Sequence, residues 1–395
     1  MRRRPPTGSI AIGANTGIAV DAASTRGVAI GWLTKVENAP GGVALGQSAL
    51  AGASAATAIG QGARAAQASS LSFGTAAFAN GENSVAVGTN ATTNGTDGAG
   101  GAIAIGNSAN ANAIGSVAVG ANSVALNTSA TALGNGANAG NVETLAIGGG
   151  ASATSTQSSA VGFSAAATGF QSTALGAMSS AADNSTIAVG YNASASNYAG
   201  VALGLDSVTD GNSTVSIGRA ATSHGARSIA VGAASLADLG GAAFGESSSA
   251  TGTSSVAVGS QANASAINAI AMGTNANADT AEAVAMGTNA VATGGKAVSI
   301  GSNNTAYGDG AVAIGDPSYA SGTGAFVGGA DNIANADGTA TATAANMASG
   351  AVAIGNSNVA IGQGSVALGN TSRAGAAGSL AFGDSAIANN AGDVA

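Results

Sequence analysis

The chain has 395 residues, of which 7% are charged and 3% are aromatic, and it contains 64 glycines and no cysteine. Its net charge of −8 argues against nucleic acid as a partner. The lack of cysteine excludes a disulfide framework and a cysteine metal site. The sequence has no run of about 18 apolar residues that would predict a membrane helix, so we expect contact with a membrane only through a segment absent from this chain.

Residues 1–9 are a basic N-terminal tail without the apolar stretch of a signal peptide. We expect repeats over residues 10–328, an irregular or degenerate repeat over 329–350, and repeats again over 351–395. The C-terminus stops within a repeat, which suggests a fragment or ends covered by something else.

The repeated word is apolar-Ala-apolar-Gly, and it returns every 14 residues from Gly106 to Gly232. Single-residue slips occur at three steps, Gly315 to Gly328 among them, and a degenerate unit near Ala342 brings the expected number to about 27. A fixed period of this kind predicts a repeat architecture rather than a disordered linker.

Each repeat contains two short segments with the alternation of strands. The second segment has small residues three and five positions after the glycine, as in Ala137 and Ala139, around a variable position. Glycine and asparagine between the segments favour turns. Two strands and two turns make one flattened coil, and successive coils should stack as parallel strands about 4.8 Å apart.

The middle position of the first segment is almost always Ala or Ser, whereas its neighbours are large and apolar, as in Val117 and Val119. We expect the large residues to pack inward against the paired alanines. The middle column would then point outward, where only a close neighbouring surface would restrict its size, which predicts a chain–chain interface. The opposite assignment, with Val and Ile toward the axis and Ala inward, stays open. The column contains Ala104, Ala118, Ala132, Ala146, Ala160, Ala174, Ala188 and Ala202.

The words SVAVG (84–88 and 116–120), TIAVG (186–190) and SVALG (365–369) resemble the head repeats of trimeric autotransporter adhesins, the YadA-like heads. The resemblance implies a left-handed parallel β-roll, a homotrimeric rod and display on the bacterial cell surface. It also implies binding to an extracellular matrix protein, a cell-surface receptor or glycan, or other bacteria. Phage tail fibres and other extracellular fibres can use the same repeats, so a structural spacer or fibre subunit is the alternative.

Insertions that break the period are candidate ligand-contact loops, because insertions in repeat proteins map to loops. They point to Trp32, Lys35 and Glu37 near the N-terminus and to Asp97 in a second insertion. Trp32, the only tryptophan, is also a candidate for capping the end of the array.

Nothing in the sequence predicts an enzyme. His224 is the only histidine and has no second histidine or cysteine beside it. The aspartates lack the ligand spacing of a calcium loop. We therefore expect no catalytic residue, no metal site and no cofactor.

Overall fold

The computed structural model describes residues 7–13, 19–20, 24–94 and 100–395. The chain divides into two compact units, Met1–Ala199 (unit 1) and Gly200–Ala395 (unit 2), and each is a solenoid of parallel strands. Among the described residues the only helix is the short 3₁₀ turn η1 (Ala344–Asn346). None of them forms a helix long and apolar enough to span a membrane.

Every coil contributes one odd-numbered strand to one sheet, the odd sheet, and one even-numbered strand to a second, the even sheet. In unit 1 the odd sheet consists of β1 (Ile10–Ile12), β3 (Val28–Ile30), β5 (Val43–Leu45), β7 (Thr57–Ile59), β9 (Leu71–Phe73), β11 (Val85–Val87), β13 (Ile103–Ile105), β15 (Val117–Val119), β17 (Thr131–Leu133), β19 (Leu145–Ile147), β21 (Ser159–Val161), β23 (Thr173–Leu175) and β25 (Ile187–Val189). Its even sheet consists of β2 (Ala19–Val20), β4 (Lys35–Val36), β6 (Leu50–Ala51), β8 (Arg64–Ala65), β10 (Phe78–Ala79), β12 (Thr92–Thr93), β14 (Asn110–Ala111), β16 (Val124–Ala125), β18 (Asn138–Ala139), β20 (Ser152–Ala153), β22 (Ala166–Ala167), β24 (Ser180–Ala181) and β26 (Ser194–Ala195).

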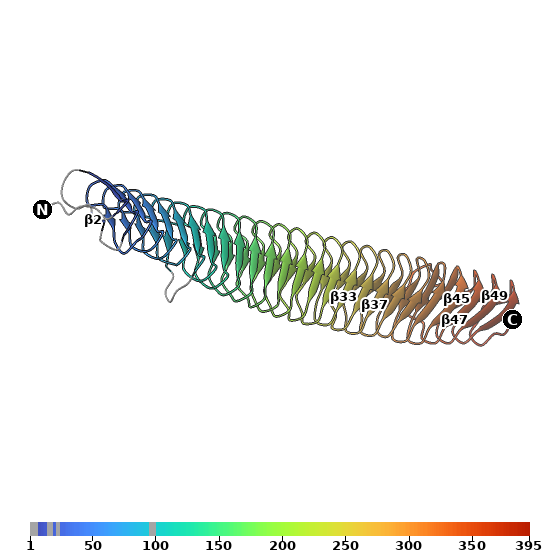
Figure 1. Ribbon diagram of the computed structural model, residues 1–395. Helices are drawn as coiled ribbons and strands as arrows, with labels where there is room; N and C mark the ends of the chain where they lie inside the picture. Colours follow the sequence, from blue (N-terminus) through green and yellow to red (C-terminus); the bar gives the residue numbers. More distant parts are fainter. Residues whose placement is uncertain (1–6, 14–18, 21–23, 95–99) are drawn as a thin grey trace. The chain divides into compact units, whose positions relative to one another are not determined.

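Unit 2 repeats this arrangement, and Figure 1 shows β45, β47 and β49 as neighbouring arrows. Its odd sheet consists of β27 (Val201–Leu203), β29 (Val215–Ile217), β31 (Ile229–Val231), β33 (Ala242–Phe244), β35 (Val256–Val258), β37 (Ile270–Met272), β39 (Val284–Met286), β41 (Val298–Ile300), β43 (Val312–Gly315), β45 (Phe326–Ala330), β47 (Val352–Asn356), β49 (Val366–Asn370) and β51 (Leu380–Asp384). Its even sheet consists of β28 (Val208–Thr209), β30 (Thr222–Ser223), β32 (Leu236–Ala237), β34 (Ser249–Ala250), β36 (Asn263–Ala264), β38 (Asn277–Ala278), β40 (Val291–Thr293), β42 (Thr305–Tyr307), β44 (Ser318–Ser321), β46 (Asn332–Asn335), β48 (Val359–Ile361), β50 (Arg373–Ala374) and β52 (Ile387–Ala388).

The 14-residue period is the distance between residues that pair in neighbouring coils. Ala118 of β15 pairs with Ala104 of β13 on one side and with Ala132 of β17 on the other, in parallel register. The even strands shift equally, since Val124 pairs with Asn110 and with Asn138. The predicted parallel solenoid is therefore confirmed.

Two turns close each coil. The first turn runs from the repeat glycine to the even strand, and the second turn runs from the even strand to the next odd strand. Each contains a residue in the left-handed region, such as Asn122 (φ 56°) in the first turn and Ser129 (φ 56°) in the second. Inward hydroxyls complete the turns, since Ser123 Oγ donates to the Gly120 carbonyl at 2.8 Å. The turn carbonyl is thus satisfied inside the coil.

The repeat glycine has two separate reasons to be glycine. Gly259 has a φ of 130°, a conformation that side chains disfavour. A Cβ at this position would also lie 2.6 Å from the carbonyl oxygen of Gly273 in the next coil. Close stacking on the next coil therefore requires glycine at this position, and the contact recurs one coil later, where a Cβ at Gly273 would lie 2.5 Å from the Gly287 carbonyl oxygen.

The interior consists mainly of alanine, together with serine, threonine and a few asparagine and valine side chains. The paired alanines of the second segment, such as Ala137 just before β18 and Ala139 within it, are fully buried as predicted, and so is the middle column of the odd strands. In β15 the inward residue is Ala118, while Val117 and Val119 point outward and stay partly exposed. The expected inward Val and Ile were therefore wrong. The two sheets of one coil lie so close together that only small side chains fit between them.

This burial corrects the predicted interface column. The exposure of each of its alanines is 0% within a single chain. A side chain enclosed by its own coil offers no surface to a neighbouring chain, and the size restriction comes from the narrow core. The correction applies to Ala104, Ala118, Ala132, Ala146, Ala160, Ala174, Ala188 and Ala202.

The expected slip between Gly315 and Gly328 was also wrong. Gly315 pairs with Gly329, which keeps the 14-residue step, and Gly329 pairs with Gly355. The 12 extra residues of this longer step, 336–347, form an excursion from the second turn and not a coil of their own. The 52 strands therefore make about 26 coils rather than about 27.

Three coils of unit 2 have a buried asparagine where other coils have a small residue. Asn304, Asn332 and Asn358 each follow a repeat glycine by three positions and are fully buried. The Asn358 amide donates to the carbonyl of Ile354 in its own coil at 2.9 Å and to that of Gly369 in the next coil at 2.7 Å. These side chains connect neighbouring coils.

Candidate functional surfaces

The outer face of the odd sheet, here the odd-sheet face, carries two columns of large apolar side chains that a single chain leaves uncovered. No described odd strand has a charged residue at its first or third position, which are the outward ones. Contiguous exposed apolar surface on this scale indicates an interaction site. More than a third of the surface is exposed for Leu45, Phe73, Ile105, Leu133, Leu175 and Ile187 in unit 1, and for Ile217, Ile229, Phe244, Met272, Met286, Ile300, Ile314, Ile354 and Phe382 in unit 2.

The outer face of the even sheet has a different character. Its outward column mixes apolar, polar and charged residues, as predicted, and includes Arg64, whose guanidinium lies 5.4 Å from the centre of the Phe78 ring. Amide side chains stack between coils, with Asn263 Nδ2 donating to Asn277 Oδ1 at 2.7 Å. Such a surface can offer many shallow polar contacts and no deep one.

The first candidate loop is exposed. Trp32 is 46% exposed in the first turn after β3. Because β1 pairs with β3, another coil stacks on this one, and Trp32 does not cap an open end. Lys35 lies on β4, and its ammonium contacts the Glu37 carboxylate at 3.2 Å. An exposed pair of this kind contributes about 0–1 kcal/mol.

The second candidate, Asp97, lies outside the described residues. The longest described departure from the period is the excursion 336–347. Asn346 Oδ1 accepts from the Thr343 backbone N–H at 2.9 Å, while its amide donates to the Thr341 carbonyl at 3.1 Å. Hydrogen bonds from the Thr339 hydroxyl and then the Thr339 N–H lower the pKa of the Asp337 carboxyl below its ordinary value. The excursion is therefore ordered by its own polar contacts.

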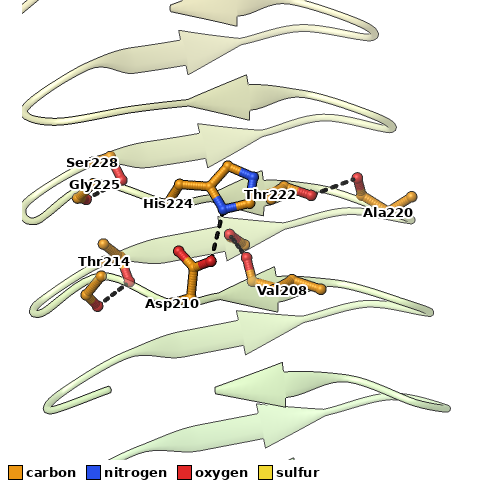
Figure 2. Close-up of polar contacts among 10 residues, drawn as sticks. Val208, Asp210, Thr214, Ala220, Thr222, His224, Gly225 and Ser228 are labelled. Atoms are coloured by element: carbon orange, nitrogen blue, oxygen red, sulfur yellow. Dashed lines mark hydrogen bonds and ion pairs between the residues drawn. The ribbon is translucent and has the colours of Figure 1, made fainter. Parts of the chain in front are cut away.

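His224 has a carboxylate partner that sequence analysis missed. It follows β30, and Asp210 follows β28 of the preceding coil; Figure 2 shows the two side chains pointing toward each other. His224 Nδ1 lies 2.8 Å from Asp210 Oδ2, and both side chains are about half exposed. Their separation of 14 residues, one repeat, was the signal that could have paired them.

The pair lacks the surroundings of a catalytic or metal site. Among the described residues, no group of three His, Cys, Asp or Glu side chains is placed to hold a metal ion. The hydroxyls near the pair, such as those of Thr214 and Ser228, donate to carbonyls of their own turns. With both side chains in contact with water, the arrangement is a surface ion pair when His224 is protonated.

Comparison with known families gives a repeated match to one of them, described as YadA head domain repeat (2 copies). The matched residues are 65–91, 79–97, 99–123, 167–193, 184–207, 210–235, 240–262, 264–290, 281–304, 292–316, 306–332 and 348–372. Together they cover more than half of the chain. The comparison with curated proteins found no match.

Proposed function

Because the chain belongs to the family of YadA head domain repeats, we propose that it is the head region of an adhesin at the bacterial cell surface. Three copies assemble side by side, and the assembly binds an extracellular matrix protein, a cell-surface receptor or a glycan. The repeats and the solenoid serve a structural and binding role rather than a catalytic one.

The odd-sheet face is the observation that carries this proposal. It is largely apolar, the described odd strands have no charged residue at their first or third position, and it stays exposed in a single chain, as Leu133 (44%) and Leu175 (46%) illustrate. Turning three such faces toward a common axis would remove them from water, which is the main favourable term in association. Closed cyclic symmetry fits identical chains that share one long surface.

The even sheet and the outer parts of the turns would then face the surroundings. Their repeated polar side chains favour many weak contacts over a single pocket. Three chains with about 13 coils in each unit multiply such contacts, and linked weak contacts produce strong overall attachment. A large, shallow ligand such as a matrix fibre or a glycan coat suits this arrangement.

The assembly can be tested by light scattering on the full chain. We expect three times the chain mass of 36.1 kDa. Replacing Leu133 and Leu175 with Glu should yield monomers, because charge would be buried at the axis. The matched changes Asn138→Glu and Ser180→Glu, on the even sheet of the same unit, should leave the trimer intact. A wild-type chain with the mass of a monomer would contradict the assembly.

Binding is tested separately, with the purified full chain on arrays of matrix proteins and glycans and on host and bacterial cells. We expect saturable binding to at least one class, weakened strongly in the monomeric Leu133→Glu, Leu175→Glu chain. A trimer that binds none of them would contradict the adhesin role and favour a spacer in an extracellular fibre.

A further inference from the structure

Two coils of unit 1 carry exposed aromatic side chains on both of their turns. Phe163 and Tyr191 each follow a repeat glycine in the first turn, and their exposures are 65% and 49%. Phe170 and Tyr198 lie in the second turn of the same two coils, with exposures of 42% and 53%. Aromatic rings exposed to this extent leave a large apolar area that another surface could cover.

The two groups cannot meet within one chain. In each coil the even strand separates them, β22 in one case and β26 in the other. At about 3.3 Å per extended residue, the two edges of a coil are on the order of 15 Å apart. Along each edge, the next coil interposes another residue, Asn184 in the second turn, which accepts a hydrogen bond from the Phe170 N–H at 3.0 Å.

A cyclic assembly places these edges against each other. Neighbouring chains in a ring contact through two different surfaces, one from each chain. Both turns flank the odd-sheet face, so with that face toward the axis, the first-turn edge of one chain approaches the second-turn edge of the next. If the axis runs along the stacking direction, every coil meets its counterpart at nearly the same level.

We propose that Phe163 and Tyr191 of each chain pack against Phe170 and Tyr198 of the next chain, forming an aromatic clasp at each of the three junctions. This inference rests on the proposed homotrimer and names the partner surface as a second copy of the chain. The clasp would bury rings that contribute neither to the core nor to the odd-sheet face.

The clasp would fix the axial register of the three chains, which the repeats alone specify weakly. The odd-sheet face looks almost the same after a shift of one coil, about 4.8 Å, and a uniform strand pattern specifies register weakly. The aromatic residues do not recur in every coil: Ala177 stands between Phe163 and Tyr191, and Asn184 between Phe170 and Tyr198. A shift of one coil would place these smaller residues opposite rings. The clasp therefore holds the three chains in axial register.

Cysteine cross-linking tests the clasp directly, because the natural chain contains no cysteine. We expect the full-length double variant Phe163→Cys, Phe170→Cys to form disulfide-linked dimers and trimers under mild oxidation. The matched control Phe163→Cys, Asn184→Cys displaces one partner by a coil. It should cross-link at least about tenfold less, since a disulfide requires Cα atoms within about 7 Å.

Light scattering before oxidation separates the two proposals. A trimer in which both pairs cross-link equally would overturn the clasp and leave the assembly standing. A monomer would overturn both. A further test compares the rate of maleimide labelling of Phe170→Cys in the trimer with its rate in the monomeric Leu133→Glu, Leu175→Glu background. Equally rapid labelling in the two would also overturn the clasp and would assign this edge to an external ligand.

Discussion

The regular coils of unit 1, from Gly106 to Ala199, and the asparagine-containing coils of unit 2, from Gly301 to Gly383, have different internal hydrogen bonds although both follow the 14-residue step, except for the longer step from Gly329 to Gly355. In unit 1 the inward hydroxyl three positions after the glycine bonds back to its own turn, as Ser179 Oγ does to the Gly176 carbonyl at 2.8 Å. In unit 2 the Asn358 amide at the same position reaches the next coil as well. Ser372 Oγ, at the same position of the following coil, also donates to the next coil, to the Gly383 carbonyl at 2.7 Å, so bonds between coils in this region come from both asparagine and serine.

The length of the odd strands also differs between the two regions. The odd strands of the regular coils have three residues, whereas β47, β49 and β51 have five, since pairing there continues through the repeat glycine. Stability in a solenoid is a sum of coil terms and interface terms between coils. The comparison indicates that the regular coils depend on tight packing of small residues, and the coils near Asn358 also on polar links between neighbours.

The largest effect should come from enlarging the regular core. Replacing Ala118, Ala146 and Ala174 with Leu should unfold much of unit 1, because overpacking costs about 1–3 kcal/mol at each site. Circular dichroism and chemical denaturation measure the loss. The outward changes Thr131→Leu and Thr173→Leu, in neighbouring odd strands, should leave the free energy of unfolding nearly unchanged. If the triple variant stayed folded and changed only its oligomeric state, the alanine column would face a chain interface after all.

A smaller effect is expected from cutting one link between coils. Asn358→Ala should lower the stability of the surrounding coils by about 1–3 kcal/mol, because it leaves buried carbonyls unpaired. Amide hydrogen exchange in β47 and β49 would detect it. Ser179→Ala is the matched change in unit 1 and should cost under about 0.5 kcal/mol, since Ala137 and Ala193 already occupy this position. Equal losses in the two variants would show that the asparagine links add nothing.

The smallest effect concerns the excursion 336–347 beside the asparagine coils. The folded pKa of Asp337 is lower than its ordinary value of 3.8. The stability that its charged form contributes is therefore complete above about 3.8 and is lost as the pH falls through the folded value. We expect amide protection at Thr339 to decrease in that acid range with the rest of unit 2 intact. Asp337→Asn should remove this pH dependence, and a variant with the same profile as wild type would rule out the assignment.

Much of the fold could be predicted from the sequence, because the repeated Gly and the paired alanines leave a strict period. Which side chains of the odd strands point into the core could not be predicted. The pattern of Ala118 between Val117 and Val119 shows only that side chains on one side of the strand must be small. A narrow core and a neighbouring chain would impose the same restriction. The burial of Ala118 inside its own coil decides between these two interpretations, and the alternation of residue sizes along the strand does not specify that burial. The Asp210–His224 contact was missed for a simpler reason, since it requires comparing positions one full repeat apart.

The glycine column has a consequence for how such a protein changes size. Gly259 and Gly273 fit together because each coil presents the same backbone to the next, so deleting or duplicating one 14-residue repeat joins surfaces that already match. Each event would change the length of a unit by about 4.8 Å without disturbing the remaining contacts. Gain or loss of whole repeats in the gene can therefore change the length of the protein in small, equal increments.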